Sequence, residues 1–565
     1  MTEKKAKKEP PKKKFPKFAE MKKPVIISGV IITIAVAGII IGINLYSKST
    51  QFGGDLYYWG YGFPFTFDPI DVMDLVDAEV INQVAESLFS IDENSEIIYG
   101  LATYHEWSID GLNLTCTLRK HVKFHDGTPF NATAVKWNID RAYRLIDIIP
   151  FSFLWLLPDG TPIINETQVL DEYTVKFILN APYAPLLSLF ASTYSSILSP
   201  SATPPDDFIN METGDLVGTG PFKYDFYVPD DNLTLSRNPY YWGPKPKIDK
   251  LIFLLPKRSI DKALKSGEIH MKKSVWFNES TLNSFISNRS FTVSDPIHLP
   301  NLDFIVMNNK LINITMRKSI SYAFNYSNYL LYPWFVSAKG PIPESILYHN
   351  ISGIKVPYYN ITIARQTLKD GNWPGTENLT VNEDISPGNE WELLANSPTP
   401  LATYNYSACY NWPRSILYGD RIVEDLKQIG VKIEPYNLTL TEWYYIAYEL
   451  EGHHRNMIEL GFSFWYADYN DPSNFINEFY TNKKIGENMG QVNDTQVQEW
   501  FEKAVFEIDP NARKQLYYKI QKRLIEEVFP NVWLTSRTRT DIYVSNLRGW
   551  YPHAFIDSFK SVKFV

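Results

Sequence analysis

One continuous apolar stretch near the N-terminus constrains this chain more than any other feature of its sequence. Residues 25–45, from Val25 to Leu45, read VIISGVIITIAVAGIIIGINL and include no charged side chain. As a helix they would be about 31 Å long, which matches a bilayer hydrocarbon core of about 30 Å. A helix on the surface of a water-soluble fold would show a polar stripe, and none is present. The sequence therefore predicts one transmembrane helix over 25–45.

The charges on either side of this stretch predict its orientation. Residues 1–24 carry ten Lys and three Glu, whereas only Lys48 follows closely on the other side. Because lysines stay in the cytoplasm, residues 1–24 are expected to be a cytoplasmic tail of a single-pass protein of the cell membrane, with everything after the anchor outside the cytoplasm. A cleaved signal peptide is the alternative, but its apolar region usually spans about 7–15 residues and ends at a small-residue cleavage site, which is absent here.

Glycosylation sequons support the same compartment. Fourteen N-x-S/T sequons follow the anchor, more than random placement of these residue types would produce. They begin at Asn113, Asn131, Asn165, Asn232, Asn278, Asn288, Asn313, Asn325, Asn350, Asn360, Asn378, Asn405, Asn437 and Asn493. The excess predicts an exported glycoprotein of the kind found on glycosylated, archaeal-type cell surfaces.

The charge balance disfavours one class of partner. The whole chain carries a net charge of −8 and the first 24 residues carry +7, so the remainder carries −15. Such an acidic body is not expected to bind nucleic acid. Only two cysteines, Cys116 and Cys409, are present, so disulfides are not expected to be the main support of the fold.

Helical and strand-like patterns alternate along the rest of the chain, which favours α/β lobes. The stretch from about 375 to 399, rich in Asn, Glu, Pro and Gly, is expected to be an exposed insertion. No GxxxxGK[ST], GxSxG or HExxH motif occurs, so neither catalysis nor a cofactor is predicted. His121 and His125 lie four residues apart in a strand-like segment, about 13 Å from each other, so no metal site is predicted either.

Five motifs follow in a fixed order. They are LRKHVKFHDGTPFNATAV from Leu118, GTGPFK from Gly218, RNPYYWG from Arg237, MRKSISYAFN from Met316 and FWYADYNDPSNF from Phe464. Together they resemble the family 5 solute-binding proteins of ABC importers, which carry peptides and, in some members, nickel or sugars. The resemblance extends from about residue 55 to the C-terminus. Most of these motifs are expected to be structural, with glycines that allow tight backbone turns.

This resemblance implies an α/β fold of the two-lobe periplasmic-binding-protein type, class II, with an extra subdomain, in addition to the N-terminal transmembrane helix. Lobe one would span 51–300, with the extra subdomain at about 91–210, and lobe two would span 301–530. Residues 531–565 would return to lobe one. In such folds the ligand lies between the lobes, whose closure buries it.

The resemblance also implies a ligand site. In peptide-binding relatives the acid of the last motif pairs with the peptide α-ammonium and its Trp lines the cleft; these positions are Asp468 and Trp465. The alternative for Asp468 is a turn or capping role beside Asn470-Asp471-Pro472. Further residues expected to contact ligand are Tyr466, Tyr469, Trp412, Tyr410 and Arg414. Arg414 would bind a peptide carboxylate, although its spacing departs from the family pattern.

The sequence thus predicts a membrane-anchored, extracytoplasmic receptor, not an enzyme, that captures short peptides for ABC permease subunits. Aromatic residues make up 15% of the chain, and aromatic faces suit stacking on sugars, so an oligosaccharide ligand in the same fold is the first alternative. A surface sensor or adhesin ectodomain without transport is the second.

Overall fold

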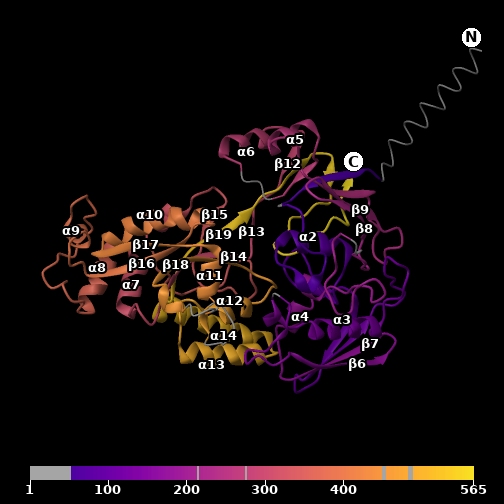
Figure 1. Ribbon diagram of the computed structural model, residues 1–565, viewed down its shortest axis with the longest axis horizontal. Coiled ribbons are helices and arrows are strands. Elements are labelled where there is room, and N and C mark those ends of the chain that lie inside the picture. The colour runs from indigo at the N-terminus through magenta and orange to yellow at the C-terminus, as the bar shows by residue number, and fades with distance from the viewer. Residues whose placement is uncertain are drawn as a thin grey trace, which may run out of the picture. The chain divides into compact units, whose positions relative to one another are not determined.

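The computed structural model describes residues 53–565 except 61, 150, 213–215, 274–276, 448, 450–453 and 482–487. The predicted cytoplasmic tail and the predicted anchor at 25–45 lie outside the described residues. Within the described part, no helix is both long enough and apolar enough to cross a membrane. Residues 53–565 form one unit, which contains two lobes (Figure 1).

Lobe one is built on a mixed seven-stranded sheet. Its order is β12 (Phe291–Val293), β20 (Ile542–Val544), β11 (Met271–Lys272), β1 (Asp55–Trp59), β10 (Lys250–Leu254), β9 (Asn232–Arg237) and β8 (Phe222–Val228). Strand β1 is parallel to β10 and β11, whereas β8, β9 and β10 are antiparallel. Alternation along β1 buries Leu56 and Tyr58, and the Tyr58 hydroxyl donates to Glu79 of helix α2 (Leu75–Val84).

The extra subdomain is a four-stranded antiparallel sheet covered by helix α3 (Ala132–Arg144). The sheet order is β4 (Ala102–Trp107), β5 (Asn113–Leu118), β7 (Thr174–Leu179) and β6 (Ile164–Asp171). The Asn131 side chain caps α3 by accepting a hydrogen bond from the Ala134 amide at 3.0 Å. Smaller elements lie nearby: β2 (Phe89–Ile91), β3 (Ile97–Tyr99) and α4 (Leu186–Leu189). All of these fall close to the range 91–210 expected for this subdomain.

Two of the sequence motifs meet where the subdomain joins lobe one. The His125 amide donates to the Gly218 carbonyl at 2.9 Å, and the His125 ring bonds to the Gly220 carbonyl at 3.0 Å. A Cβ atom at Gly218 would lie only 2.3 Å from the Val84 carbonyl oxygen at the end of α2. Because the backbones approach so closely, only glycine fits there, and these motifs have a structural role.

Lobe two is built on a second seven-stranded sheet. Its path runs β13 (Ile297–His298), β19 (Asn531–Arg539), β14 (Asn301–Met307), β18 (Leu460–Tyr466), β16 (Ala402–Cys409) and β17 (Val431–Leu438), and β15 (Phe335–Ser337) also pairs with β19. Every residue of β14 is buried, as expected for a central strand covered on both faces. Cys116 of β5 and Cys409 of β16 are both free thiols.

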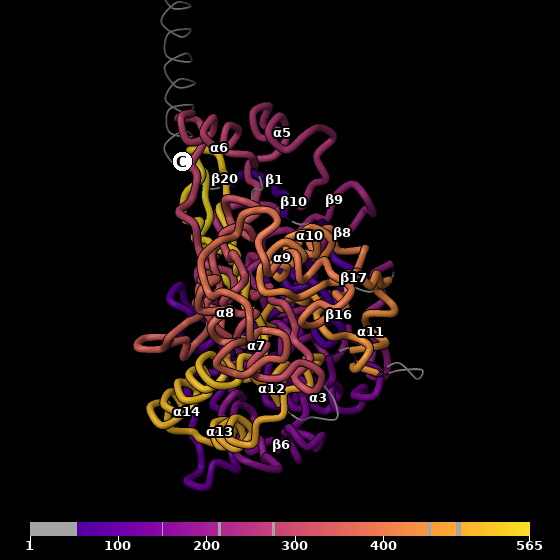
Figure 2. Tube along the Cα trace, turned by 90° about the vertical axis from the view of Figure 1, so that its left-hand side faces the viewer, coloured from indigo at the N-terminus to yellow at the C-terminus, as the bar shows by residue number. Residues whose placement is uncertain are grey.

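Helices cover this second sheet and extend toward the subdomain. They are α7 (Ile314–Ala323), α8 (Ile361–Asp370), α9 (Glu390–Ala395), α10 (Pro413–Lys427), α11 (Leu440–Ala447), α12 (Ser473–Tyr480), α13 (Thr495–Phe506) and α14 (Pro510–Arg523). Figure 1 and Figure 2 both place α13 near the extra subdomain, and the Ala184 amide donates to the Val505 carbonyl at 2.8 Å. The stretch expected to be an exposed insertion contains α9, whose Trp391 is fully buried.

The chain passes between the lobes twice, through residues 294–296 and residues 540–541, and these two segments are called the hinge below. The Ser294 amide donates to the Asp541 carbonyl, and the Asp541 amide donates to Ser294 Oγ, both at 2.9 Å. Strand β19 is part of the second sheet, so the return to lobe one follows Arg539 instead of starting at residue 531 as expected. The boundary differs because β19 continues without a break to the hinge.

Buried ionic groups fix the lobe-one end of the hinge. The Arg539 guanidinium forms two hydrogen bonds with Asp541 at 2.8 Å each and two with Asp557 at 2.9 Å each. Lys273 pairs with Asp557 and, at 2.9 Å, with Glu79 of α2. Burial alone would raise the pKa of Asp557, but Arg539 and Lys273 outweigh it and hold that pKa well below its usual range.

Asp557→Ala should therefore destabilise the protein by about 3–5 kcal/mol, because two buried cations lose a shared partner. Urea unfolding at pH 7 measures the change. Glu434→Ala is the matched control, since Glu434 pairs with Lys432 at the surface, where an ion pair contributes about 1 kcal/mol or less. Equal losses in the two variants would contradict this role for Asp557.

Candidate ligand-binding cleft

A cavity of about 590 Å³ lies between the two lobes. Lobe one and its subdomain contribute Val72, Met73, Phe151, Tyr194 and Phe555, among others, and lobe two contributes Trp412, Trp443, Phe464, Trp465, Tyr466, Asp468 and Tyr469. The volume falls within the range of about 300–1,000 Å³ that is usual for small-molecule sites. Ten of the described lining residues are aromatic, and they come from both lobes.

Strand β18 brings the predicted residues to this cavity. Its first half is buried in the second sheet through Leu460 and Phe462, and its last residues emerge half-buried at the cleft. Pairing with β14 places Trp465 opposite Leu302. Beyond the end of the strand the chain turns back into α12, and this turn presents Asp468 to the cavity.

Asp468 is held by side chains from both lobes. Its Oδ1 accepts a hydrogen bond from the Tyr194 hydroxyl at 3.1 Å, and its Oδ2 accepts one from Asn474 Nδ2 at 2.8 Å. Asn474 Oδ1 in turn accepts hydrogen bonds from the Trp465 indole at 2.9 Å and from the Asp468 amide at 3.1 Å. One amide side chain thus fixes the relative positions of the carboxylate and the tryptophan.

Burial raises the pKa of Asp468 to about 6, although the hydrogen bonds from Asn474 and Tyr194 favour the ionised form. No Lys or Arg among the described residues lines the cavity, where Asp74 and Asp468 are the only charged side chains. Asp74 already caps α2. Asp468 therefore lacks a cationic partner in this cavity, and its ionisation would be favoured by a ligand that supplies one.

The turn after Asp468 is fixed by its neighbour Asp471. Asp471 is fully buried and forms two hydrogen bonds with Arg513 of α14, at 2.5 and 2.8 Å. The Asp471 side chain also accepts from the Ser473 amide at the start of α12. Asp471 thus fixes this turn, and Asp468 also bonds to Asn474 of α12 while its carboxylate lines the cavity.

Arg414 lies behind the aromatic wall. It pairs with Asp303 of β14, and its guanidinium lies 5.4 Å from the centre of the Phe464 ring. Asp303 is fully buried and also bonds to Arg537 at 3.1 Å, so one carboxylate serves two guanidinium groups. Arg414 is not among the described residues that line the cavity, and the structure does not bring it together with the other predicted ligand residues.

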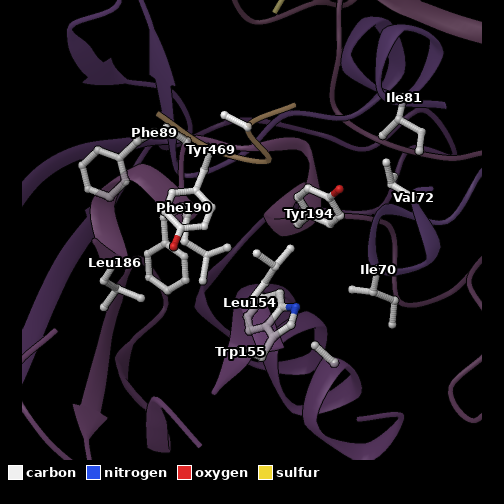
Figure 3. Close-up of a cluster of buried hydrophobic side chains, with 14 of the residues drawn as sticks. Ile70, Val72, Ile81, Phe89, Leu154, Trp155, Leu186, Phe190, Tyr194 and Tyr469 are labelled. Atoms are coloured by element: carbon white, nitrogen blue, oxygen red, sulfur yellow. The ribbon is translucent and has the colours of Figure 1, made fainter. Parts of the chain in front are cut away.

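The predicted tyrosines and Trp412 divide into two groups. Trp412, Tyr466 and Tyr469 line the cavity, whereas Tyr410 is 54% exposed and is not among the lining residues. Tyr469 comes from lobe two but packs beside Phe190 and Phe89 of lobe one, as Figure 3 shows. One hydrophobic cluster therefore includes this ring from lobe two together with residues of lobe one.

Sequence reasoning missed three residues of this site. Tyr194 and Trp443 are far from the recognised motif in the sequence, and nothing local marks them. Asn474 lies inside the motif, and its position six residues after Asp468 on the following helix was the one available signal. Among the described residues, no group of three His, Cys, Asp or Glu side chains is arranged to hold a metal ion.

Direct contacts join the lobes beside the cavity. The Ser188 hydroxyl donates to the Asn470 carbonyl at 3.1 Å, and Asn470 Nδ2 donates to the Ser95 carbonyl at 2.8 Å. Together with the Tyr194–Asp468 hydrogen bond, these contacts stabilise the approach of the lobes. Tyr194–Asp468 is the one among them that ends on a cavity-lining carboxylate.

Comparison with known proteins gives a consistent result. Residues 96–487 match the family described as bacterial extracellular solute-binding proteins, family 5 Middle. The glutathione-binding protein GsiB of Escherichia coli (strain K12) is 25% identical over 494 residues, which are 86% of this chain and 90% of that protein. The similarity is long enough to include both lobes.

Two solved structures have the same fold. The periplasmic binding protein DppA from Helicobacter pylori, in complex with the peptide STSA, is 24% identical with a TM-score of 0.67, covering 92% of this chain and 99% of that one. HbpA2 from Haemophilus parasuis is 21% identical with a TM-score of 0.75, covering 91% and 100%. The predicted two-lobe fold is confirmed.

Tyr194→Phe should open the ligand-free protein, because it removes one hydrogen bond between the lobes and keeps the aromatic ring in the wall. A hydrogen bond to a charged group contributes about 1.5–3 kcal/mol. Small-angle X-ray scattering measures the expected rise in radius of gyration, with Tyr410→Phe as the control. A Tyr194→Phe variant with an unchanged scattering curve would contradict the bridging role.

Proposed function

This chain belongs to the bacterial extracellular solute-binding proteins of family 5, and we propose that it captures short peptides outside the cell for an ABC importer. Proteins of this family bind a solute and do not transform it. The observation that carries the proposal is Asp468, a carboxylate without a cationic partner in an aromatic cavity between the lobes. Its natural counterpart is the α-ammonium group of a peptide.

The geometry around Asp468 leaves room for such a contact. Tyr194 and Asn474 each use one acceptor site of the carboxylate, one on each oxygen. Each oxygen of an ionised carboxylate has a second acceptor site, so an ammonium group can bind without displacing either residue. In a cavity shielded from water this charge-assisted contact is worth about 1.5–3 kcal/mol.

The C-terminal carboxylate of the peptide limits how short the ligand can be. No Lys or Arg lines the described cavity wall. Arg414, the cation expected there, is paired with Asp303 behind Phe464. A ligand carboxylate enclosed in this cavity would lose hydration without gaining a cation, which is costly. We therefore favour peptides long enough to keep their carboxylate outside the cavity. The relative from Helicobacter pylori, solved with the peptide STSA, supports a peptide ligand.

The sequence supports placing this receptor at the membrane. Residues 25–45 would anchor it by one helix, with residues 1–24 in the cytoplasm and the body outside. A tether keeps the binding protein close to the permease and raises its effective concentration there without any new contact. This placement requires the body to be reachable by a protease added to intact cells.

An oligosaccharide is the second candidate ligand. The rings of Trp412, Trp443 and Trp465 line one side of the cavity, and such faces suit stacking on sugar rings. A neutral sugar has hydroxyl groups that can donate hydrogen bonds to Asp468, but it has no ammonium group with which to form an ion pair. Dependence of binding on an ammonium group of the ligand therefore separates the two candidates.

Asp468→Asn should weaken peptide binding about 10- to 150-fold, corresponding to the loss of about 1.5–3 kcal/mol, and should weaken sugar binding less, because a sugar loses only a hydrogen bond to the charge and not an ion pair. Isothermal titration calorimetry against a set of short peptides and oligosaccharides measures both. An N-acetylated peptide has no ammonium group, so its affinity for the unaltered protein should be lower by the same factor. Asp74→Asn is the matched control, because Asp74 also lines the cavity but caps a helix, and Asn caps equally well. A peptide ligand would be ruled out if no peptide bound.

Peptide affinity should also depend on pH with a defined sign. The Asp468 pKa of about 6 means that the carboxylate is protonated, and cannot pair with ammonium, below that pH. The peptide amine stays protonated to about pH 7.7. Calorimetry between pH 4.5 and 7 should show affinity falling up to tenfold per unit below about pH 6, and the Asp468→Asn variant should lack this slope. A flat profile for the unaltered protein would contradict the assignment.

A further inference from the structure

Each of the three large sheets has an edge strand that carries, or directly follows, a glycosylation sequon. Strand β6 pairs only with β7, β17 only with β16, and β12 only with β20 among the described strands. An edge strand presents unpaired N–H and C=O groups to which a second chain can add. Proteins protect such edges with bulges, charges, prolines or a covering group.

In the extra subdomain the sequon residue is Asn165 of β6. The register shifts between Ile164 and Glu166, so Asn165 is the unpaired residue of a bulge, and it is exposed. A bulged residue can carry a large group without disturbing the ladder on the paired side of the strand.

In lobe two the sequon residue is Asn437 near the end of β17. It is exposed, and it lies opposite Ala408 in the parallel pairing with β16. The same strand contains Pro435, which cannot donate a hydrogen bond and is typical of an edge. Two separate features thus mark β17 as a protected edge.

In lobe one the sequon residue is Asn288, three residues before the start of β12. Its Oδ1 accepts a hydrogen bond from the Ser290 amide at 3.0 Å, and this turn leads the chain into the edge strand. The sequon serine, Ser290, keeps its position because its carbonyl accepts the Ser545 amide at 2.8 Å. A group attached to Nδ2 of Asn288 would leave both contacts intact.

Sequons on interior strands differ from these three. Asn405 of β16 donates from Nδ2 to the Met457 carbonyl and accepts from the Glu459 amide, and Asn113 of β5 donates from Nδ2 to Ser108 Oγ. Both strands are paired on two sides. Their amide nitrogens are used within the fold, which disfavours modification.

We propose that Asn165, Asn437 and Asn288 carry N-linked glycans that cover the edges of β6, β17 and β12. This rests on the proposed function in two respects, namely that the body lies outside the cytoplasm and that residues 25–45 anchor it in the membrane. The donor is a lipid-linked oligosaccharide of the membrane. A bond forms between Asn Nδ2 and the anomeric carbon, the bond from that carbon to the lipid phosphate oxygen breaks, and the amide nitrogen releases one proton as the lipid phosphate leaves.

Such glycans protect a surface that tethering makes vulnerable. Receptors anchored in one membrane meet repeatedly in similar orientations, so edge-to-edge strand addition is a specific hazard for them. A bulky solvated group at each edge prevents this addition sterically. None of the fourteen sequon asparagines is among the described residues lining the cavity, so the glycans leave ligand binding unaffected.

The first test uses the full chain purified from the membranes of the cells that produce it. Intact glycopeptide mass spectrometry should find sugar on Asn165, Asn288 and Asn437, and none on Asn405 or Asn113. The proposal would be overturned if other sequons carried sugar while Asn165, Asn288 or Asn437 carried none. A chain without sugar at any position would overturn it as well. Protease treatment of intact cells then shows whether the body is outside, and so separates a wrong location from wrong sites.

The second test measures association. A triple variant, Asn165→Gln, Asn288→Gln and Asn437→Gln, should show a several-fold rise in high-mass species in size-exclusion chromatography with light scattering. The matched control is Asn131→Asp, Asn313→Asp and Asn360→Asp, which removes three sequons at helix N-caps while Asp keeps each cap. Equal association in the two triple variants would overturn the shielding role. Calorimetry with peptides on both triple variants tests the proposed function separately. Both variants should bind peptide with the same affinity.

Discussion

Arg539 binds two carboxylates at the point where the chain returns from lobe two to lobe one, and the rest of the molecule depends on this contact. Asp541 belongs to the hinge, Asp557 to the C-terminal segment, and Lys273 extends the cluster to Glu79 of α2. Separated, these buried charges would each be unstable, but together they satisfy one another. They tie the hinge to three distant parts of lobe one. The lobes can therefore move relative to each other about residues 294–296 and 540–541 while lobe one keeps its own structure.

The same chemistry explains why Asp468 stands out. Asp303, Asp471 and Asp557 are buried carboxylates, and each is paired with at least one guanidinium group. Asp468 has only the neutral partners Tyr194 and Asn474, and its raised pKa is the consequence. Asp425 and Glu86 also have neutral hydrogen-bond partners and raised pKa values, but neither lines the cavity, whereas Asp468 does. On the proposed function, the ammonium group of a bound peptide supplies the positive charge that Asp468 lacks in the cavity.

The sequence predicted those cavity residues that lie together in one short segment of the chain. Trp465, Tyr466, Asp468 and Tyr469 follow one another along β18 and the turn, so a single motif was enough to identify them. Tyr194 could not be predicted, because its contact with Asp468 depends on how the two lobes meet. Arg414 has the side chain expected for a carboxylate ligand, but Asp303, which neutralises it, lies 111 residues earlier in the chain, so their pairing could not be predicted from local sequence. The fold was predictable because its motifs occur in order, whereas the boundary at 531 was not, since β19 runs past it as one strand. The anchor remains a prediction from sequence.

Strand β19 has one further consequence for how the receptor responds to its ligand. Arg537 of this strand bonds to Tyr466 at the cavity, and Arg539, two residues further on, forms the ion pairs at the hinge. Two residues of a strand span about 7 Å. On the proposed function, a solute that shifts Tyr466 would therefore act on β19 at a point only two residues from the hinge, so that a small displacement in the cavity would be passed to the segment about which the lobes turn. On the proposed function, the permease would distinguish the loaded from the empty receptor by the angle between the lobes before it accepts the solute.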